Sequence, residues 1–300
     1  MDANLILKRE KEFIDKVCNQ YHYDSNITHL LYIMIPAFII KYGVSQEKLI
    51  LNVFQEVQII SSEKENKIVK AFYSSTPNQV MGEFTTRKYM VIQNYKDIQL
   101  VELLDNLVHE FNHAINSYVN EIKVMKQYVY LRTGLTYRIY QKEPLQFIRK
   151  QASYILEEII NTKQTSDVIN IIKNMQLDDR EMMNTIYAVN GETTSTYFSD
   201  SYYLQSYVCK EILNNRTFIS TLENLRLKGE IYDIEKWFDD ITGERNSYKQ
   251  LNDNLEKVYR LELKYVEQRF FKSITLGKIK DCSNRIIRIV QKFNNNVNFR

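Results

Sequence analysis

The sequence contains few residues that interrupt regular structure: its 300 residues include seven glycines and three prolines. Glycine supplies the positive φ angles of tight turns and proline ends helices, so their scarcity predicts few tight turns and long helices. Hydrophobic residues make up 44% of the chain and charged residues 26%, which is typical of a globular protein with one large domain or two smaller ones. We therefore expect an α+β fold that is predominantly helical.

Cysteine pairs, massed charge and long apolar runs are also missing. The three cysteines are far apart and form no CxxC pair: Cys18, Cys209 and Cys282. This argues against a disulfide framework and a cysteine zinc site. The net charge of +3 comes from interspersed basic and acidic residues, so we expect no nucleic-acid partner. The longest apolar run, Leu30 to Ile40, is shorter than the roughly 20 residues that span a bilayer, which predicts no membrane partner. Without a secretory signal at residues 1–12, a cytoplasmic location is expected.

Hydrophobic periodicity divides the chain into stretches. Residues 1–56 are expected to form an N-terminal helical part, whose third helix begins after Ser45 as its N-cap. Between about 57 and 94 the residues rich in Val, Ile, Thr, Phe and Tyr predict a small antiparallel sheet. Its three strands are expected over 57–60, 67–74 and 84–93, with turns at 61–66 and 75–78.

A second group of elements follows residue 120. Residues 128–140 look like a short hairpin folded around Thr133 and Gly134, although an aromatic-rich helix is an alternative. From about Pro144 the pattern is helical, and residues 201–300 are expected to form a C-terminal helical part. Breaks in this helical region are expected at four glycines: Gly191, Gly229, Gly243 and Gly277.

One motif indicates a chemistry: His109, Glu110 and His113 form an HExxH sequence. Two imidazoles four residues apart on a helix lie on one face, which suits two ligands of a tetrahedral zinc ion with the glutamate as general base. The apolar residues from Leu104 to Val119 form one stripe at helical spacing, and the histidines fall roughly opposite it. The same polar side carries possible hydrogen-bond partners for the imidazoles: Glu102, Asp105, Asn106, Asn116 and Asn120. The alternative is a solvated polar face that carries two histidines by chance.

A zinc site needs a third protein ligand. The two other histidines, His22 and His29, both lie far upstream, so we expect a carboxylate. Residues 151–165 form a second amphipathic pattern in which Glu157 and Glu158 lie equally far from the apolar stripe, so periodicity does not choose between them. Glu158 can also be an ordinary solvent-facing glutamate. Two carboxylates elsewhere are further alternatives: Glu143 and Glu192.

From about residue 57 to 165 the chain resembles the HExxH zinc peptidases of the glutamate-ligand type, the gluzincins. In that superfamily a second helix carries the ligand in a setting similar to NExxN/T followed by a threonine, and 157–161 with Thr165 looks like that setting. The resemblance implies Glu158 as the third ligand, Zn²⁺ as cofactor and a zincin-like catalytic core over residues 57–200. Three features depart from the pattern: Glu157 precedes the ligand, Ile159 follows it, and the distance from His113 exceeds that of the thermolysin-like branch.

The resemblance also implies an activity, the hydrolysis of peptide bonds in a peptide or protein substrate. Glu110 would act as the general base towards a metal-activated water. Related enzymes often use a downstream Tyr or His as oxyanion donor, and here the candidates are tyrosines, with Tyr197 named first: Tyr197, Tyr137, Tyr202 and Tyr203. The strand over 84–93 looks like the edge strand that pairs with an extended substrate. Two other functions remain open: a regulatory protease with a single protein substrate, and a non-catalytic helical interaction module with a degenerate motif.

Overall fold

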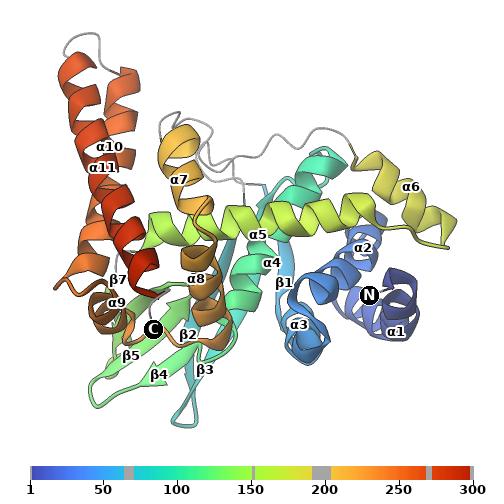
Figure 1. The fold of residues 1–300 in the computed structure, drawn as a ribbon. Helices are drawn as coiled ribbons and strands as arrows, with labels where there is room; N and C mark the ends of the chain where they lie inside the picture. The colour runs from blue at the N-terminus through green and yellow to red at the C-terminus, as the bar shows by residue number, and fades with distance from the viewer. Residues whose placement is uncertain (1, 64–70, 151–152, 191–203, 268–271, 298–300) are drawn as a thin grey trace. The chain divides into compact units, whose positions relative to one another are not determined.

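The computed structural model describes residues 2–63, 71–150, 153–190, 204–267 and 272–297. It confirms an α+β fold that is predominantly helical, at about 65% helix, with two small sheets (Figure 1). The chain forms two compact units: unit 1 is Met1–Tyr118 with Lys163–Ser195, and unit 2 is Val119–Thr162 with Thr196–Arg300. The division falls inside one continuous helix, α5 (Tyr154–Asn174), so both units include part of α5.

Unit 1 begins with helices close to those expected: α1 (Ala3–Tyr21), α2 (Ser25–Tyr42) and α3 (Glu47–Glu56). Asp2 and Asp24 cap the first two, because each side chain accepts a backbone N–H of the first turn. The expected cap at Ser45 is wrong. Ser45 lies inside a 3-10 turn, η1 (Val44–Gln46), and Gln46 precedes α3 without a side-chain cap bond.

Helix α2 forms much of the core of unit 1, with every residue from Leu30 to Ile39 buried. No single helix in the described part of the chain has both the length and the apolarity to cross a membrane. Among the described residues, α2 and residues 44–56 together reach the length and apolar composition of a membrane-spanning segment. These two parts are bent by 114° at the break between them.

The first sheet contains β1 (Gln58–Ser62), β2 (Ala71–Val80) and β3 (Glu83–Gln93) in the order β1-β3-β2. The prediction of a wholly antiparallel sheet is wrong, because β1 runs parallel to β3 while β2 runs antiparallel to it. The prediction that residues 84–93 form an edge strand is also wrong, because β3 has a partner on each side. The predicted turn at 75–78 is wrong as well. Strand β2 continues through Pro77 to a turn at Met81 and Gly82, whose positive φ angles are 50° and 87°.

Two more helices complete unit 1 together with the second half of α5: α4 (Leu100–Ser117) and α6 (Arg180–Ala188). Helix α5 is the one expected around residues 151–165, but it continues to Asn174.

Unit 2 contains a four-stranded antiparallel meander: β4 (Ile122–Val124), β5 (Tyr128–Thr133), β6 (Thr136–Gln141) and β7 (Gln146–Lys150). The expected hairpin is confirmed, since β5 pairs with β6 around Gly134 at a φ of 57°. The expectation of helix from Pro144 is wrong for residues 146–150, which form β7. With five residues, β7 is too short to show a distinct period.

The remaining helices of unit 2 follow residue 203: the π-helical turn η2 (Leu204–Cys209), α7 (Lys210–Leu213), α8 (Arg216–Lys228), α9 (Ile234–Thr242), α10 (Ser247–Glu267) and α11 (Lys272–Val297). Gly229 and Gly243 end α8 and α9 in the left-handed conformation, as expected. The break predicted at Gly277 is wrong, because α11 continues through it. Gly191 lies outside the described residues.

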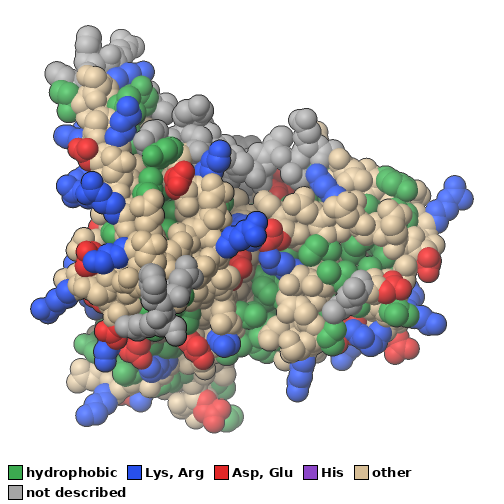
Figure 2. Space-filling model, viewed as in Figure 1, with side chains coloured by type: hydrophobic (Ala, Val, Ile, Leu, Met, Phe, Trp, Pro, Cys, Tyr) green, Lys and Arg blue, Asp and Glu red, His purple; other side chains and the backbone are tan. Residues whose placement is uncertain are grey.

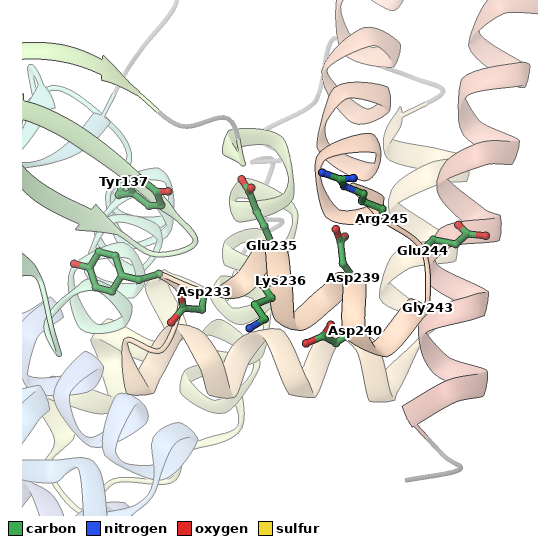
Figure 3. A pocket seen from close by; sticks show the side chains of 10 residues that line it. Tyr137, Asp233, Glu235, Lys236, Asp239, Asp240, Gly243, Glu244 and Arg245 are labelled. Atoms are coloured by element: carbon green, nitrogen blue, oxygen red, sulfur yellow. The ribbon is translucent and has the colours of Figure 1, made fainter.

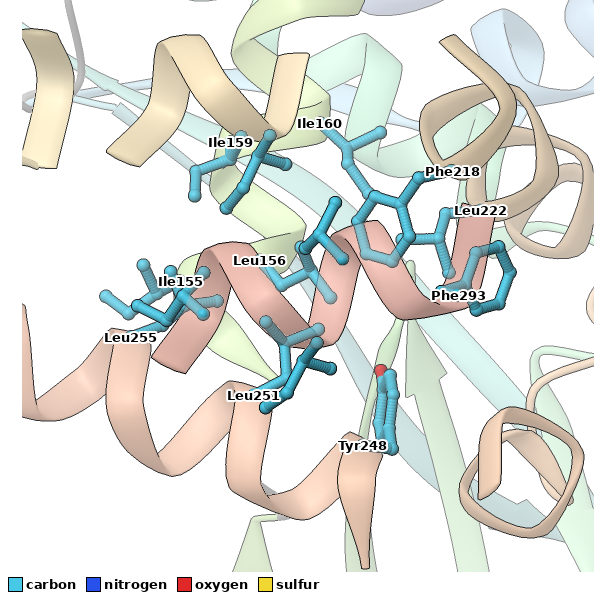
Figure 4. Packing of buried hydrophobic residues seen from close by; sticks show 14 of the residues in the cluster. Ile155, Leu156, Ile159, Ile160, Phe218, Leu222, Tyr248, Leu251, Leu255 and Phe293 are labelled. Carbon is cyan, nitrogen blue, oxygen red and sulfur yellow. The ribbon is translucent and has the colours of Figure 1, made fainter. Parts of the chain in front are cut away.

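The core of unit 2 assembles around the first half of α5. Figure 4 shows its apolar side packed with residues of α8, α10 and α11. The contributing α5 residues are Ile155, Leu156, Ile159 and Ile160, and the residues around them include Phe218, Leu222, Leu251, Leu255 and Phe293. On the surface shown in Figure 2, basic and acidic side chains are interspersed, in keeping with the small net charge.

Two fully buried arginines connect the elements of unit 2. Arg226 of α8 forms an ion pair with Glu157 of α5 and donates to the side-chain oxygen of Asn161 at 3.1 Å. Arg132 of β5 donates to the carbonyl oxygens of Gly134 and Arg226, both at 3.0 Å. Burial lowers the pKa of Arg132 to about 10. Buried charges need such partners, because an unpaired one is very costly in a low-dielectric interior.

Replacing Arg226 by methionine tests the ion pair. Arg226→Met leaves the Glu157 carboxylate buried without its cation, and we expect a loss of about 3–5 kcal/mol in the free energy of unfolding. The matched change Arg260→Met removes an exposed ion pair with Glu256 and should cost about 0.5 kcal/mol or less. Urea unfolding measures both. Equal losses in the two variants would show that the buried Arg226–Glu157 pair matters no more than an exposed one. The double variant Glu157→Met with Arg226→Met should recover part of the lost unfolding free energy.

Candidate metal centre

Helix α4 carries the HExxH motif and is buried on more than its apolar side. Glu110 and His113 are 5% and 7% exposed, and Asn112 and Asn116 are fully buried, while His109 is half-buried. The alternative of a solvated polar face is therefore wrong for this helix. The expected polar line is also shorter than predicted, because α4 ends at Ser117 and Asn120 lies beyond it.

The two histidines of the motif lie side by side. Their ring centroids are 5.0 Å apart and the ring planes meet at 77°. This is the relation expected of residues i and i+4, whose side chains lie one turn apart on the same face. The two imidazoles thus lie on one side of α4.

Glu158 of α5 is the carboxylate that joins them. One ligand atom each from His109, His113 and Glu158 can be chosen so that all lie within 4.8 Å of one another. Glu158 is 4% exposed, so it is not a solvent-facing helix glutamate. Two imidazoles and one carboxylate form the donor set of many catalytic zinc sites with three protein ligands. The residues present therefore fit a zinc ion.

The neighbouring Glu157 has a different role. Its side chain accepts the N–H of Leu135 at 2.7 Å and pairs with Arg226. A Cβ added at Gly134 would lie 2.1 Å from the Glu157 carboxylate, so the hairpin approaches this carboxylate as closely as only glycine allows. Consecutive residues point 100° apart on a helix, and this separates the two carboxylates into different surroundings.

A buried hydrogen-bond network fixes α5 against α4 within unit 1. The Asn112 amide donates to the Thr165 hydroxyl at 3.2 Å, and the Asn116 amide donates to the Gln164 side-chain oxygen at 3.0 Å. Tyr42 of α2 donates to the Asn112 side-chain oxygen at 2.8 Å and accepts from Asn116 at 2.9 Å. Asn112 was not among the residues selected from the sequence, although its place inside the motif and its spacing from Asn116 were visible there.

Glu158 lies on the face of α5 that carries this network. Glu158 precedes Thr165 by seven residues, which is about two helical turns, so both side chains lie on the same face of α5. Thr165 is bonded to α4, so Glu158 shares the face of α5 from which that bond is made. The continuity of α5 thus brings the third donor to the motif.

Two further groups lie beside the motif. The Glu110 carboxylate accepts the backbone N–H of Tyr73, in strand β2, at 2.6 Å. Asp105 lies one turn before His109; burial raises its pKa to about 6, and the charge of His109 acts in the opposite direction. The Tyr73 contact could not be selected from the sequence, because the donor is a peptide group that every residue except proline carries.

The candidate oxyanion donors are only partly described. Tyr197, Tyr202 and Tyr203 lie outside the described residues. Tyr137 of β6 lines a cavity of about 700 Å³ in unit 2 together with acidic residues around α9, shown in Figure 3. Its ring packs against Tyr130 and Tyr232, and burial raises its pKa to about 12, so it is protonated at neutral pH.

The other candidate ligands lie elsewhere. His22 ends α1 in the left-handed conformation, and His29 of α2 pairs with Glu181 at 3.1 Å. Glu143 is an exposed residue that precedes Pro144 between β6 and β7. Glu192 lies outside the described residues.

Exchanging each adjacent glutamate for glutamine should separate metal binding from folding. If Glu158 is the third ligand, Glu158→Gln should weaken zinc binding by more than about a hundredfold, beyond the effect of losing an outer partner. Glu157→Gln should keep zinc affinity close to wild type and lower the free energy of unfolding by roughly 3 kcal/mol, because Arg226 loses its buried counter-ion. Chelator competition and urea unfolding measure the two quantities. The opposite pattern would mean that Glu157 is the ligand.

Asn116 offers a test of the network between α4 and α5. Asn116→Ala leaves buried acceptors on Tyr42 and Gln164 without this donor, and we expect a loss of about 2 kcal/mol or more in unfolding free energy. Asn174→Ala is the matched control. Asn174 also lies at the end of its helix and also donates to the carbonyl four residues earlier, but it is exposed, so its loss should stay within about 0.5 kcal/mol. Comparable losses would show that the buried network contributes little.

The centre is thus built from α4 and α5, with strand β2 bonded to the motif glutamate and with α2 in the hydrogen-bond network. No family model, curated protein or solved structure matches this chain. The functional interpretation therefore depends on the chemistry of these residues and on the superfamily pattern that the motif resembles.

Proposed function

We propose that this protein is a zinc-dependent metallopeptidase with a zincin-like catalytic core. The observation that carries the proposal is the grouping of the two motif imidazoles with the buried Glu158 carboxylate. The order of elements supports it: a small sheet precedes the helix with the HExxH motif, and a second helix supplies the glutamate. The regulatory protease with a single protein substrate would use the same centre and differ only in specificity.

Zinc held by His109, His113 and Glu158 would supply a Lewis acid and a bound water with a pKa near 7. Glu110 is next to the first histidine and fixed by the Tyr73 N–H, so its carboxylate can take up a proton and return it to the leaving amine. The low exposure of Glu110 and His113 excludes bulk water from these side chains. Exclusion of water strengthens the electrostatic interactions of the site.

The variant Glu110→Gln tests the role of Glu110 as general base separately from metal binding. Glutamine keeps the size of the side chain but cannot accept a proton at neutral pH. We expect about one zinc per chain in both proteins, similar thermal stability, and at least about a hundredfold slower hydrolysis of a diverse peptide mixture by the variant. Elemental analysis and mass spectrometry of the peptides measure these properties.

Three further proteins complete that experiment. Glu12→Gln, an exposed change on α1, should behave as wild type. His109→Ala and His113→Ala should lose zinc, and metal contents equal to wild type would remove the proposed site. A wild type that holds zinc and cuts no peptide in the mixture would favour the protease with a single substrate or the interaction module. Equal activity of Glu110→Gln and wild type would contradict the mechanism.

A further inference from the structure

The bond between Glu110 and the backbone of β2 suggests how the general base is oriented. Strand β2 pairs with β3 along one side, and no described strand pairs with its other side. The Tyr73 N–H donates to the Glu110 carboxylate at 2.6 Å. A charge-assisted hydrogen bond of this kind is stronger and more directional than one between neutral groups.

The pairing pattern of β2 with β3 explains why the Tyr73 N–H can donate to Glu110 and not to β3. In an antiparallel pair, the N–H and C=O groups of alternate residues point to the partner strand, and those of the remaining residues point away. Tyr73 and Pro77 belong to the same alternating set of β2, which pairs with Met90 and Thr86 of β3. Proline has no N–H and is tolerated in a strand where the ladder does not need one. The presence of Pro77 thus indicates that this set points away from β3.

We propose that the peptide N–H of Tyr73 is a positioning group for Glu110, which holds the carboxylate in one orientation beside the two histidines. The inference rests on the proposed function, because it gives Glu110 its role as general base. A glutamate side chain has three rotatable bonds, and fixing one carboxylate oxygen removes most of its alternative orientations. Small displacements of a catalytic group can slow a reaction about a hundredfold.

The test replaces the donor without removing the strand. Tyr73→Pro removes the N–H, and the extended backbone of β2 already accommodates a proline at Pro77. We expect kcat to fall about ten- to a hundredfold with KM within about threefold of wild type and with unchanged zinc content. Tyr73→Ala removes the side chain but keeps the N–H, so it should lose much less activity than Tyr73→Pro. Gln79→Pro places a proline at an exposed position of the same alternating set and should leave activity unchanged.

Amide hydrogen exchange gives a readout that does not depend on activity. The Tyr73 N–H should exchange slowly in the wild type and markedly faster in Glu110→Ala, while ladder amides of β3 such as that of Met90 stay protected in both. Unchanged exchange at Tyr73 would overturn the inference, and so would an active Tyr73→Pro that equals wild type. A wild type that holds zinc and shows the protected Tyr73 amide but cuts no peptide in the mixture would confirm the bond and overturn the proposed general peptidase activity, so the two failures are distinguishable.

Discussion

Polar groups that leave water must find partners within the protein, and the contact between α4 and α5 is built on this requirement. Asn112 and Asn116 are fully buried, and their amides are bonded to Thr165 and Gln164. Hydrophobic contacts tolerate sliding, whereas a hydrogen bond fails when its partner moves by more than a few tenths of an ångström. The two helices therefore have one favourable register over these residues, and α5 continues from them back to Glu158.

The adjacent glutamates of α5 show how one helix can serve two purposes. Glu157 is neutralised by a buried arginine and contributes to folding, while Glu158 belongs to a group that could hold a metal ion. Desolvation would be costly for either carboxylate alone, and for Glu157 the Arg226 guanidinium and the Leu135 N–H offset it. Their separation depends only on the helical rotation of 100° between consecutive residues.

Periodicity in the sequence was enough to predict the helices of residues 3–56, the motif helix and the hairpin around Gly134. It could not predict that β1 runs parallel to β3, because strand direction and order depend on contacts between distant residues. The prediction of a turn at residues 75–78 was wrong because Pro77 is compatible with the side of β2 that faces away from β3. The burial of the polar side of α4 was missed for a similar reason. A helical pattern shows which residues are polar, but not whether another helix will cover them with matching groups.

Helix α5 has a thermodynamic consequence for the centre. The two histidines belong to unit 1, but the residues that hold the first half of α5 in its core belong to unit 2. Local unfolding of unit 2 would fray this half of the helix, which carries Glu158. If Glu158 is a metal ligand, metal affinity depends on the folding of this half of the helix, and a bound ion would in turn stabilise the core that holds it.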